Sequence, residues 1–120
     1  MDDGFTIKRD EELERDHEIW VLVRRSLGLG AFGVNLVELP PGRDIPEHDE
    51  TGRDQEEVFY VVEGDTTLVV DGVDHPAPAG TWARFDPAVR RTVRNDGPAT
   101  AKVLIASAPC SSGYEPMGWA

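Results

Sequence analysis

The chain has 120 residues, of which 39% are hydrophobic, and this length and balance suit one globular domain with a single core. Its 23 acidic and 12 basic residues give a net charge of -11, which repels phosphate backbones and anionic lipid heads, so neither nucleic acid nor a membrane surface is an expected partner. The single cysteine, Cys110, excludes a disulfide within the chain. Because there is no apolar leader or membrane-length run, we expect a cytoplasmic protein.

Most of the sequence consists of short segments rich in β-branched and aromatic residues, separated by Gly, Pro, Asp or Asn. Before them, the charged residues 8–16 fit a solvated turn or a frayed helix equally well. A tight hairpin is predicted at Asp71 and Gly72, which tolerate the positive φ angles of such a turn. Strands are expected at residues 19–25, 33–39, 57–63, 66–71, 81–85, 90–95 and 100–107.

Many short, evenly spaced strands favour a β-sandwich or a small barrel. The strand at residues 57–63 is apolar on both faces beyond Glu57, with Phe59 on one face and Tyr60 on the other. A strand that is apolar on both faces is usually covered on both. We therefore expect a homodimer formed by sheet packing, to which the similarly apolar residues 67–70 contribute.

A lone histidine and several carboxylates precede this strand, in residues 40–64. Alternation places His48 and Glu50 on one side of the chain, and it places Gln55 and Glu57 on the Phe59 face of the following strand. Histidine and glutamate on neighbouring strands can hold a divalent metal, and the same residue types can form an acidic surface loop.

The spacing of these residues resembles the two sequence motifs of the cupins. The first motif is G, five residues, H, one residue, H, three or four residues, E, six residues, G, and it corresponds to Gly42, His48, Glu50, Glu57 and Gly64. The spacer before Glu57 is two or three residues longer than in the motif. The second motif is G, five residues, P, one residue, G, two residues, H, three residues, N, and its counterpart is Gly80, Asp86, Ala88, Arg91 and Asn95.

The resemblance implies an all-β fold, the cupin double-stranded β-helix or jelly-roll barrel, with N- and C-terminal extensions. The whole chain, residues 1–120, would form this single domain, with the barrel core at about residues 19–107. The resemblance also agrees with a homodimer.

Metal-binding cupins use three histidines and a glutamate, and the resemblance carries over only His48 and Glu57. Glu50 stands at the second histidine position, where a carboxylate can replace the imidazole. Arg91 stands at the third position and cannot coordinate a cation, because its guanidinium is permanently charged and only donates. Alternation turns Arg91 inward together with Val93, and the glutamates are its expected partners.

The preferred hypothesis is a cupin without a dedicated metal that binds a small, anionic or carbonyl-bearing ligand through His48, Glu50, Gln55, Glu57 and Arg91. The alternative is a metal-dependent enzyme of oxygenase or isomerase type, which would hold one divalent ion (Zn, Mn, Fe or Ni) through His48, Glu50 and Glu57. A third hypothesis is an interaction module with a filled cavity. The sequence identifies no catalytic residue and no substrate. It assigns Arg90 and Arg94 to outward, solvated strand positions, and it gives no role for Arg84.

Overall fold

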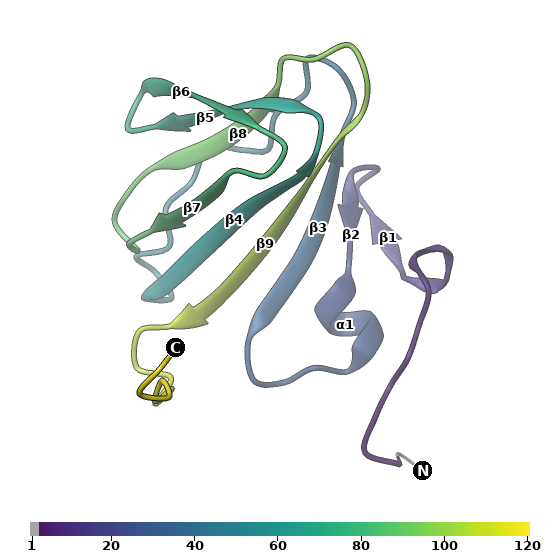
Figure 1. Cartoon of the computed structure of the whole chain (residues 1–120), viewed down its shortest axis with the longest axis vertical. Coiled ribbons are helices and arrows are strands. Elements are labelled where there is room, and N and C mark those ends of the chain that lie inside the picture. The colour runs from purple at the N-terminus through teal and green to yellow at the C-terminus, as the bar shows by residue number, and fades with distance from the viewer. Residues whose placement is uncertain (1–2) are drawn as a thin grey trace.

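The computed structural model describes residues 3–120, and its strands form two antiparallel sheets (Figure 1). The larger sheet contains, in spatial order, β1 (Arg15–Asp16), β2 (Trp20–Val21), β3 (Gly33–Leu39), β9 (Ala101–Pro109), β4 (Gln55–Glu63) and β7 (Trp82–Phe85). The smaller sheet contains β6 (Val73–Pro78), β5 (Asp65–Val70) and β8 (Arg91–Asn95). The helical elements are the short 3-10 helix η1 (Asp10–Glu12) and α1 (Val23–Leu27).

The core lies between the two sheets, and alternation along the strands fills it. On β4, Phe59 and Val61 point inward and are fully buried, whereas Tyr60 between them is half-buried on the other face. Phe59 meets Phe85 of β7 edge to face, with ring centroids 5.1 Å apart. Leu68 and other side chains of the smaller sheet complete this cluster. The predicted all-β jelly-roll fold is confirmed.

The segment predicted as a strand at residues 19–25 is a strand only at β2. Residues Val23–Leu27 form helix α1, which ends at Gly28 in the left-handed conformation, with φ of 72°. The Gly28 N–H bonds to the carbonyls of Arg24 and Arg25, which closes the last turn. Arginine and leucine have high helix propensity, and Gly28 closes the last turn of the helix. Together these local preferences outweigh the apolar pattern that suggested a strand.

Strand β6 was not predicted, because its residues read as a polar turn. The Asp71–Gly72 hairpin does form, with φ of 48° and 80° at the two residues, and it pairs β6 with β5 along their full length. The strand lies at the edge of the smaller sheet, which is where a strand tolerates Pro76. His75 is exposed there.

The charged residues 8–16 contain only the single turn η1 and the short strand β1. No helix in residues 3–120 is both long and apolar enough to cross a membrane.

Candidate ligand or metal site

A cavity of about 380 Å³ opens beside the core, next to Ile45 and Ile105. Its walls come from β2, β3, β4 and β9 and from the loop between β3 and β4. A cavity of this size accepts a small molecule. The polar side chains that line it are Asn35, His48, Glu50, Arg53, Gln55, Glu57 and Ser107.

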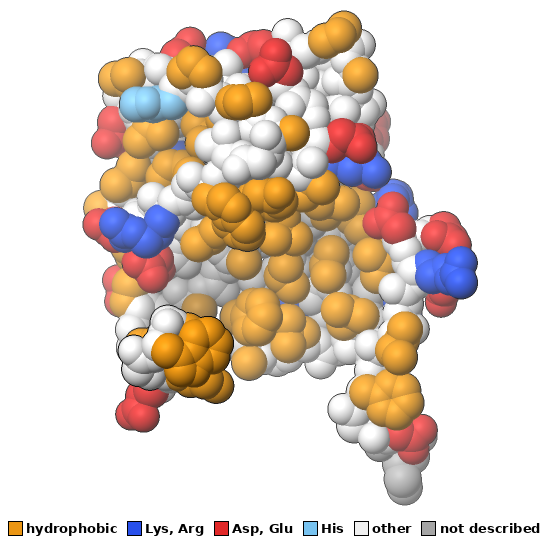
Figure 2. Space-filling model, viewed as in Figure 1, with side chains coloured by type: hydrophobic (Ala, Val, Ile, Leu, Met, Phe, Trp, Pro, Cys, Tyr) orange, Lys and Arg blue, Asp and Glu red, His pale blue; other side chains and the backbone are white. Residues whose placement is uncertain are grey.

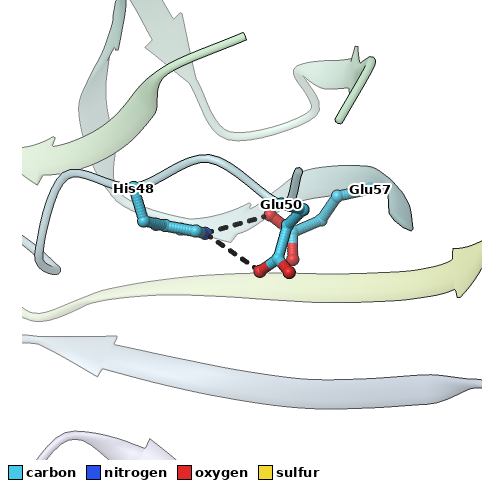
Figure 3. Close-up of side chains that lie close together, drawn as sticks. All are labelled: His48, Glu50 and Glu57. Atoms are coloured by element: carbon cyan, nitrogen blue, oxygen red, sulfur yellow. Dashed lines mark hydrogen bonds and ion pairs between the residues drawn. The ribbon is translucent and has the colours of Figure 1, made fainter. Parts of the chain in front are cut away.

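Three of these side chains converge on one point, as Figure 3 shows. His48 Nε2 lies 3.4 Å from Glu57 Oε1 and 3.6 Å from Glu50 Oε1. The other ring nitrogen, Nδ1, lies 3.0 Å from the carbonyl oxygen of Pro46. That carbonyl can only accept, so Nδ1 carries a proton and Nε2 faces the two carboxylates. The negative charge of these two carboxylates can be balanced either by a second proton on the imidazole or by a bound cation.

The ionisation of this pair follows from its contacts. The hydrogen bond with Glu57 raises the pKa of His48 above its ordinary value, although burial opposes this. Burial alone would raise the pKa of Glu57, but hydrogen bonds from His48 and Arg91 outweigh it and hold that pKa below its ordinary value. The contacts therefore favour a protonated histidine beside an ionised glutamate.

Arg91 lies directly behind Glu57 and is 0% exposed. Its Nε and Nη2 donate to Glu57 Oε1 at 3.2 and 3.0 Å, and its Nη1 donates to the carbonyl oxygens of Val89 and Asp86 at 2.7 and 3.3 Å. The guanidinium also lies 5.4 Å from the centre of the Phe85 ring. The buried charge is thus fully engaged.

Of the residues proposed from the sequence, His48, Glu50, Gln55 and Glu57 line the cavity, whereas Arg91 does not. Arg91 points inward, toward Glu57, and its fully buried guanidinium donates to Glu57 and to the Val89 carbonyl. Glu50 contacts His48, and among the described residues it makes no ion pair with Arg91.

Arg84, Arg90 and Arg94 are surface residues outside the cavity. Each forms ion pairs with neighbouring carboxylates, such as that of Arg90 with Glu47 at 3.2 Å. Exposed pairs of this kind contribute little stability.

Two cavity residues that the sequence interpretation missed are Asn35 and Ser107. Each occupies a core-facing position in an otherwise apolar series, Asn35 before Val37 on β3 and Ser107 after Ile105 on β9. A polar residue in an apolar alternation is a signal that could have identified both. Arg53 was also missed. It lies in a turn between Glu50 and Gln55 that has no sequence periodicity.

We expect the free energy of unfolding to be greatest between about pH 4.5 and pH 6.5. Since the pKa of His48 is raised, its stabilisation is present below about pH 6.5 and is lost as the pH rises through the raised value. Since the pKa of Glu57 is lowered, its stabilisation is present above about pH 4.5 and is lost as the pH falls through the lowered value.

Urea unfolding at half-unit steps of pH would measure this profile. In the His48→Gln variant, the free energy of unfolding should fall less steeply above pH 6.5 than in the wild type. His75→Gln, at an exposed position on β6, should leave it unchanged. Equal slopes for wild type and His48→Gln between pH 6.5 and 8.5 would contradict the assignment.

Comparison with known proteins gives a consistent result. The family model described as Cupin domain matches residues 35–107. A sugar phosphate isomerase from a cupin superfamily, from Silicibacter pomeroyi DSS-3, is 30% identical, with a TM-score of 0.66 over 74% of this chain and 57% of that one. This chain therefore spans little more than half the length of that protein. No curated protein matches.

Two further solved structures resemble the chain in fold. A cupin protein from Bacteroides fragilis is 21% identical, with a TM-score of 0.74 over 94% of both chains. A predicted oxalate decarboxylase from Thermotoga maritima is 19% identical, with a TM-score of 0.71 over 87% of this chain and 99% of that one.

Proposed function

The chain belongs to the cupin family, and on that premise we propose that it binds a small hydroxyl- or carbonyl-bearing molecule in its cavity without a resident metal. The observation that carries the proposal is the position of Arg91, which donates twice to Glu57 Oε1 from a fully buried site. With His48 protonated, two carboxylates face two cationic side chains. The charge of the cluster is then balanced without a metal ion.

The cavity offers complementary groups for such a ligand. Glu50 supplies an acceptor, and Asn35, Gln55 and Ser107 supply amide and hydroxyl groups that suit ligand hydroxyls or carbonyls. Arg53 forms no ion pair among the described residues and can receive an anionic group. The 30% identical neighbour is named a sugar phosphate isomerase, which makes sugars and their phosphates the first ligands to test.

The test is a thermal-melt series with free aldoses and ketoses, their phosphates, and oxalate. A true ligand at 100 times its Kd should stabilise the protein by about 2.7 kcal/mol. Glu50→Gln and Arg53→Ala should reduce this stabilisation, whereas Arg90→Ala, which removes an exposed arginine outside the cavity, should not. The absence of any shift across the panel, or equal shifts in all variants, would contradict the proposal.

A second candidate is a metal-dependent enzyme, which the convergence of His48, Glu50 and Glu57 supports. One ligand atom from each lies within 4.8 Å of the others, and one imidazole with two carboxylates is a donor set that divalent ions accept. A bound metal would supply Lewis-acid polarisation of a ligand oxygen. The chain's own residues would orient that ligand through Gln55 and Asn35.

Metal analysis separates the two candidates. We expect wild-type protein to retain far less than one metal ion per chain after dialysis against a chelator, because Arg91 already engages Glu57. Elemental analysis by mass spectrometry would measure the content. One tightly held ion per chain would favour the metal-dependent enzyme.

A further inference from the structure

A second hollow lies at one end of the larger sheet, on the face that points away from the core. It is a groove of about 640 Å³ whose floor includes Val58 of β4 and Ala106 of β9, which pair in register. Phe32, which precedes β3, and Tyr114, in the segment that follows β9, also line it. In Figure 2, hydrophobic side chains of the C-terminal segment lie at the lower left, and others extend across the middle of the same view. Most of the residues that line the groove are apolar.

The segment that carries Tyr114 is held beside the groove by hydrogen bonds. The Cys110 N–H donates to the Asp54 carbonyl at 2.8 Å, which turns the chain after β9 toward the start of β4. The Ser112 N–H then donates to the Pro109 carbonyl at 2.9 Å, and the Tyr114 N–H donates to the Ser112 hydroxyl at 3.3 Å. Because β3 lies on the other side of β9, the two aromatic side chains reach the groove from different directions.

Both aromatic side chains are open to solvent. Phe32 is 46% exposed and Tyr114 is 78% exposed, so much of each ring is uncovered. Apolar groups pack against the faces of aromatic rings, and the same faces attract cations because they carry negative charge density. A groove with aromatic walls and an apolar floor therefore suits a ligand with an apolar body, and a positive charge on that ligand adds to its affinity.

The charge around the groove is negative. Among the described residues that line it, Glu56 is the only charged one. Its ion-pair partner Arg84, at 3.1 Å, also pairs with Asp86, so one guanidinium is shared by two carboxylates. The pKa of the Cys110 thiol is raised by desolvation and then by nearby carboxylates, of which Asp54 has the largest effect. Since the whole chain has a net charge of -11, the groove attracts cations and repels anions.

We propose that this groove is a second binding site, which takes a small organic cation with an apolar body, such as an aralkylamine. The apolar body packs on Val58 and against the rings of Phe32 and Tyr114. The ammonium group lies near Glu56, where the carboxylate attracts it and the aromatic faces add cation–π attraction. The site is separate from the cavity that contains His48, because Ser107 is the one described residue that lines both hollows.

Calorimetric titration of the full chain with three probes tests the chemical class of the ligand. Phenethylamine, phenethyl alcohol and hydrocinnamate share a phenyl ring on a short alkyl chain, and at neutral pH they are a cation, a neutral molecule and an anion. Phenethylamine should bind about tenfold more tightly than phenethyl alcohol, and hydrocinnamate should bind most weakly. Equal affinities for the three probes, or no binding of phenethylamine, would overturn the proposal.

Two substitutions in the ion pair should have opposite effects. Glu56→Gln should abolish the preference for phenethylamine over phenethyl alcohol, whereas Arg84→Gln removes a competing cation and should strengthen the binding of phenethylamine. Both residues form exposed pairs, so neither substitution should unfold the chain. Arg94→Gln is the matched control, since it changes the net charge equally at an exposed pair on the smaller sheet. Equal gains from Arg84→Gln and Arg94→Gln would overturn the assignment of the cation to Glu56.

The only cysteine of the chain reports whether the groove itself is occupied. Cys110 is exposed and lines the groove, so iodoacetamide should alkylate it, and saturating phenethylamine should slow this reaction. Tyr114→Ala should weaken phenethylamine and phenethyl alcohol alike, whereas Glu50→Gln, in the other cavity, should change neither. Binding of phenethylamine that leaves the alkylation rate unchanged, or that Glu50→Gln abolishes, would place the ligand elsewhere and overturn the proposal.

Discussion

Replacement of Glu57 by alanine is expected to lower the free energy of unfolding by about 3 to 5 kcal/mol. The substitution leaves the guanidinium of Arg91 buried without its carboxylate partner, and a fully buried charge cannot recover by turning to water. The carbonyl oxygens of Val89 and Asp86 remain as acceptors, but they do not balance its charge. Denaturant unfolding of the purified variant would measure the loss.

Two further variants make this result specific. Glu56→Ala removes the neighbouring carboxylate on the opposite face of β4, which forms an exposed pair with Arg84, and it should cost less than about 1 kcal/mol. Replacing Glu57 and Arg91 together, with leucine and methionine, should recover much of the loss, because no unpaired charge remains. A Glu57→Ala variant as stable as wild type would mean that the buried pair contributes nothing.

Replacement of Arg91 by histidine is expected to strengthen binding of Zn, Mn, Fe or Ni at least tenfold. A fixed positive charge about 4 Å from an incoming cation opposes it by roughly 4 kcal/mol per unit of cation charge at an effective dielectric of 20. The substitution removes this charge, frees Glu57 Oε1, and adds an imidazole on β8 opposite His48. A tenfold change in affinity corresponds to only about 1.4 kcal/mol, which is well below the repulsion that the substitution removes.

Calorimetric titration of the metal-free proteins would measure the change. Arg90→His is the matched control, since Arg90 precedes the same strand but its side chain is exposed and pairs with Glu47. It should bind metal no more tightly than wild type. A folded Arg91→His protein that also binds no more tightly would mean that residue 91 cannot reach the point where His48, Glu50 and Glu57 converge.

The strands that carry the core could be predicted from the sequence because their alternation is regular. Residues 33–39 form a strand with the predicted bounds, and the hairpin at Asp71 and Gly72 follows from the two residue types. Helix α1 could not be predicted in this way. Its apolar and arginine residues fit either element over so short a span.

The sequence predicted the cluster of His48, Glu50 and Glu57, but it did not predict the other polar residues of the cavity or how deeply Arg91 is buried. The spacing of the motif identified His48, Glu50 and Glu57 as one candidate site. In the structure, one ligand atom from each of these residues lies within 4.8 Å of the others. Alternation indicates which way the side chain of Arg91 points, but it does not indicate whether the guanidinium reaches the cavity or ends against a carboxylate and carbonyl oxygens.

The loop that carries His48 is fastened to the smaller sheet by backbone bonds. The His48 N–H donates to the Arg91 carbonyl at 3.1 Å, and the Arg91 N–H donates to the His48 carbonyl at 2.9 Å. A second bridge joins Asp44 to Arg94 further along the same strand. The cavity wall is therefore ordered before any ligand arrives, so a ligand does not have to offset the loss of backbone entropy in this loop. On the proposed function, recognition would be close to rigid docking, and a ligand of the wrong shape would be rejected by a wall that does not adjust to it.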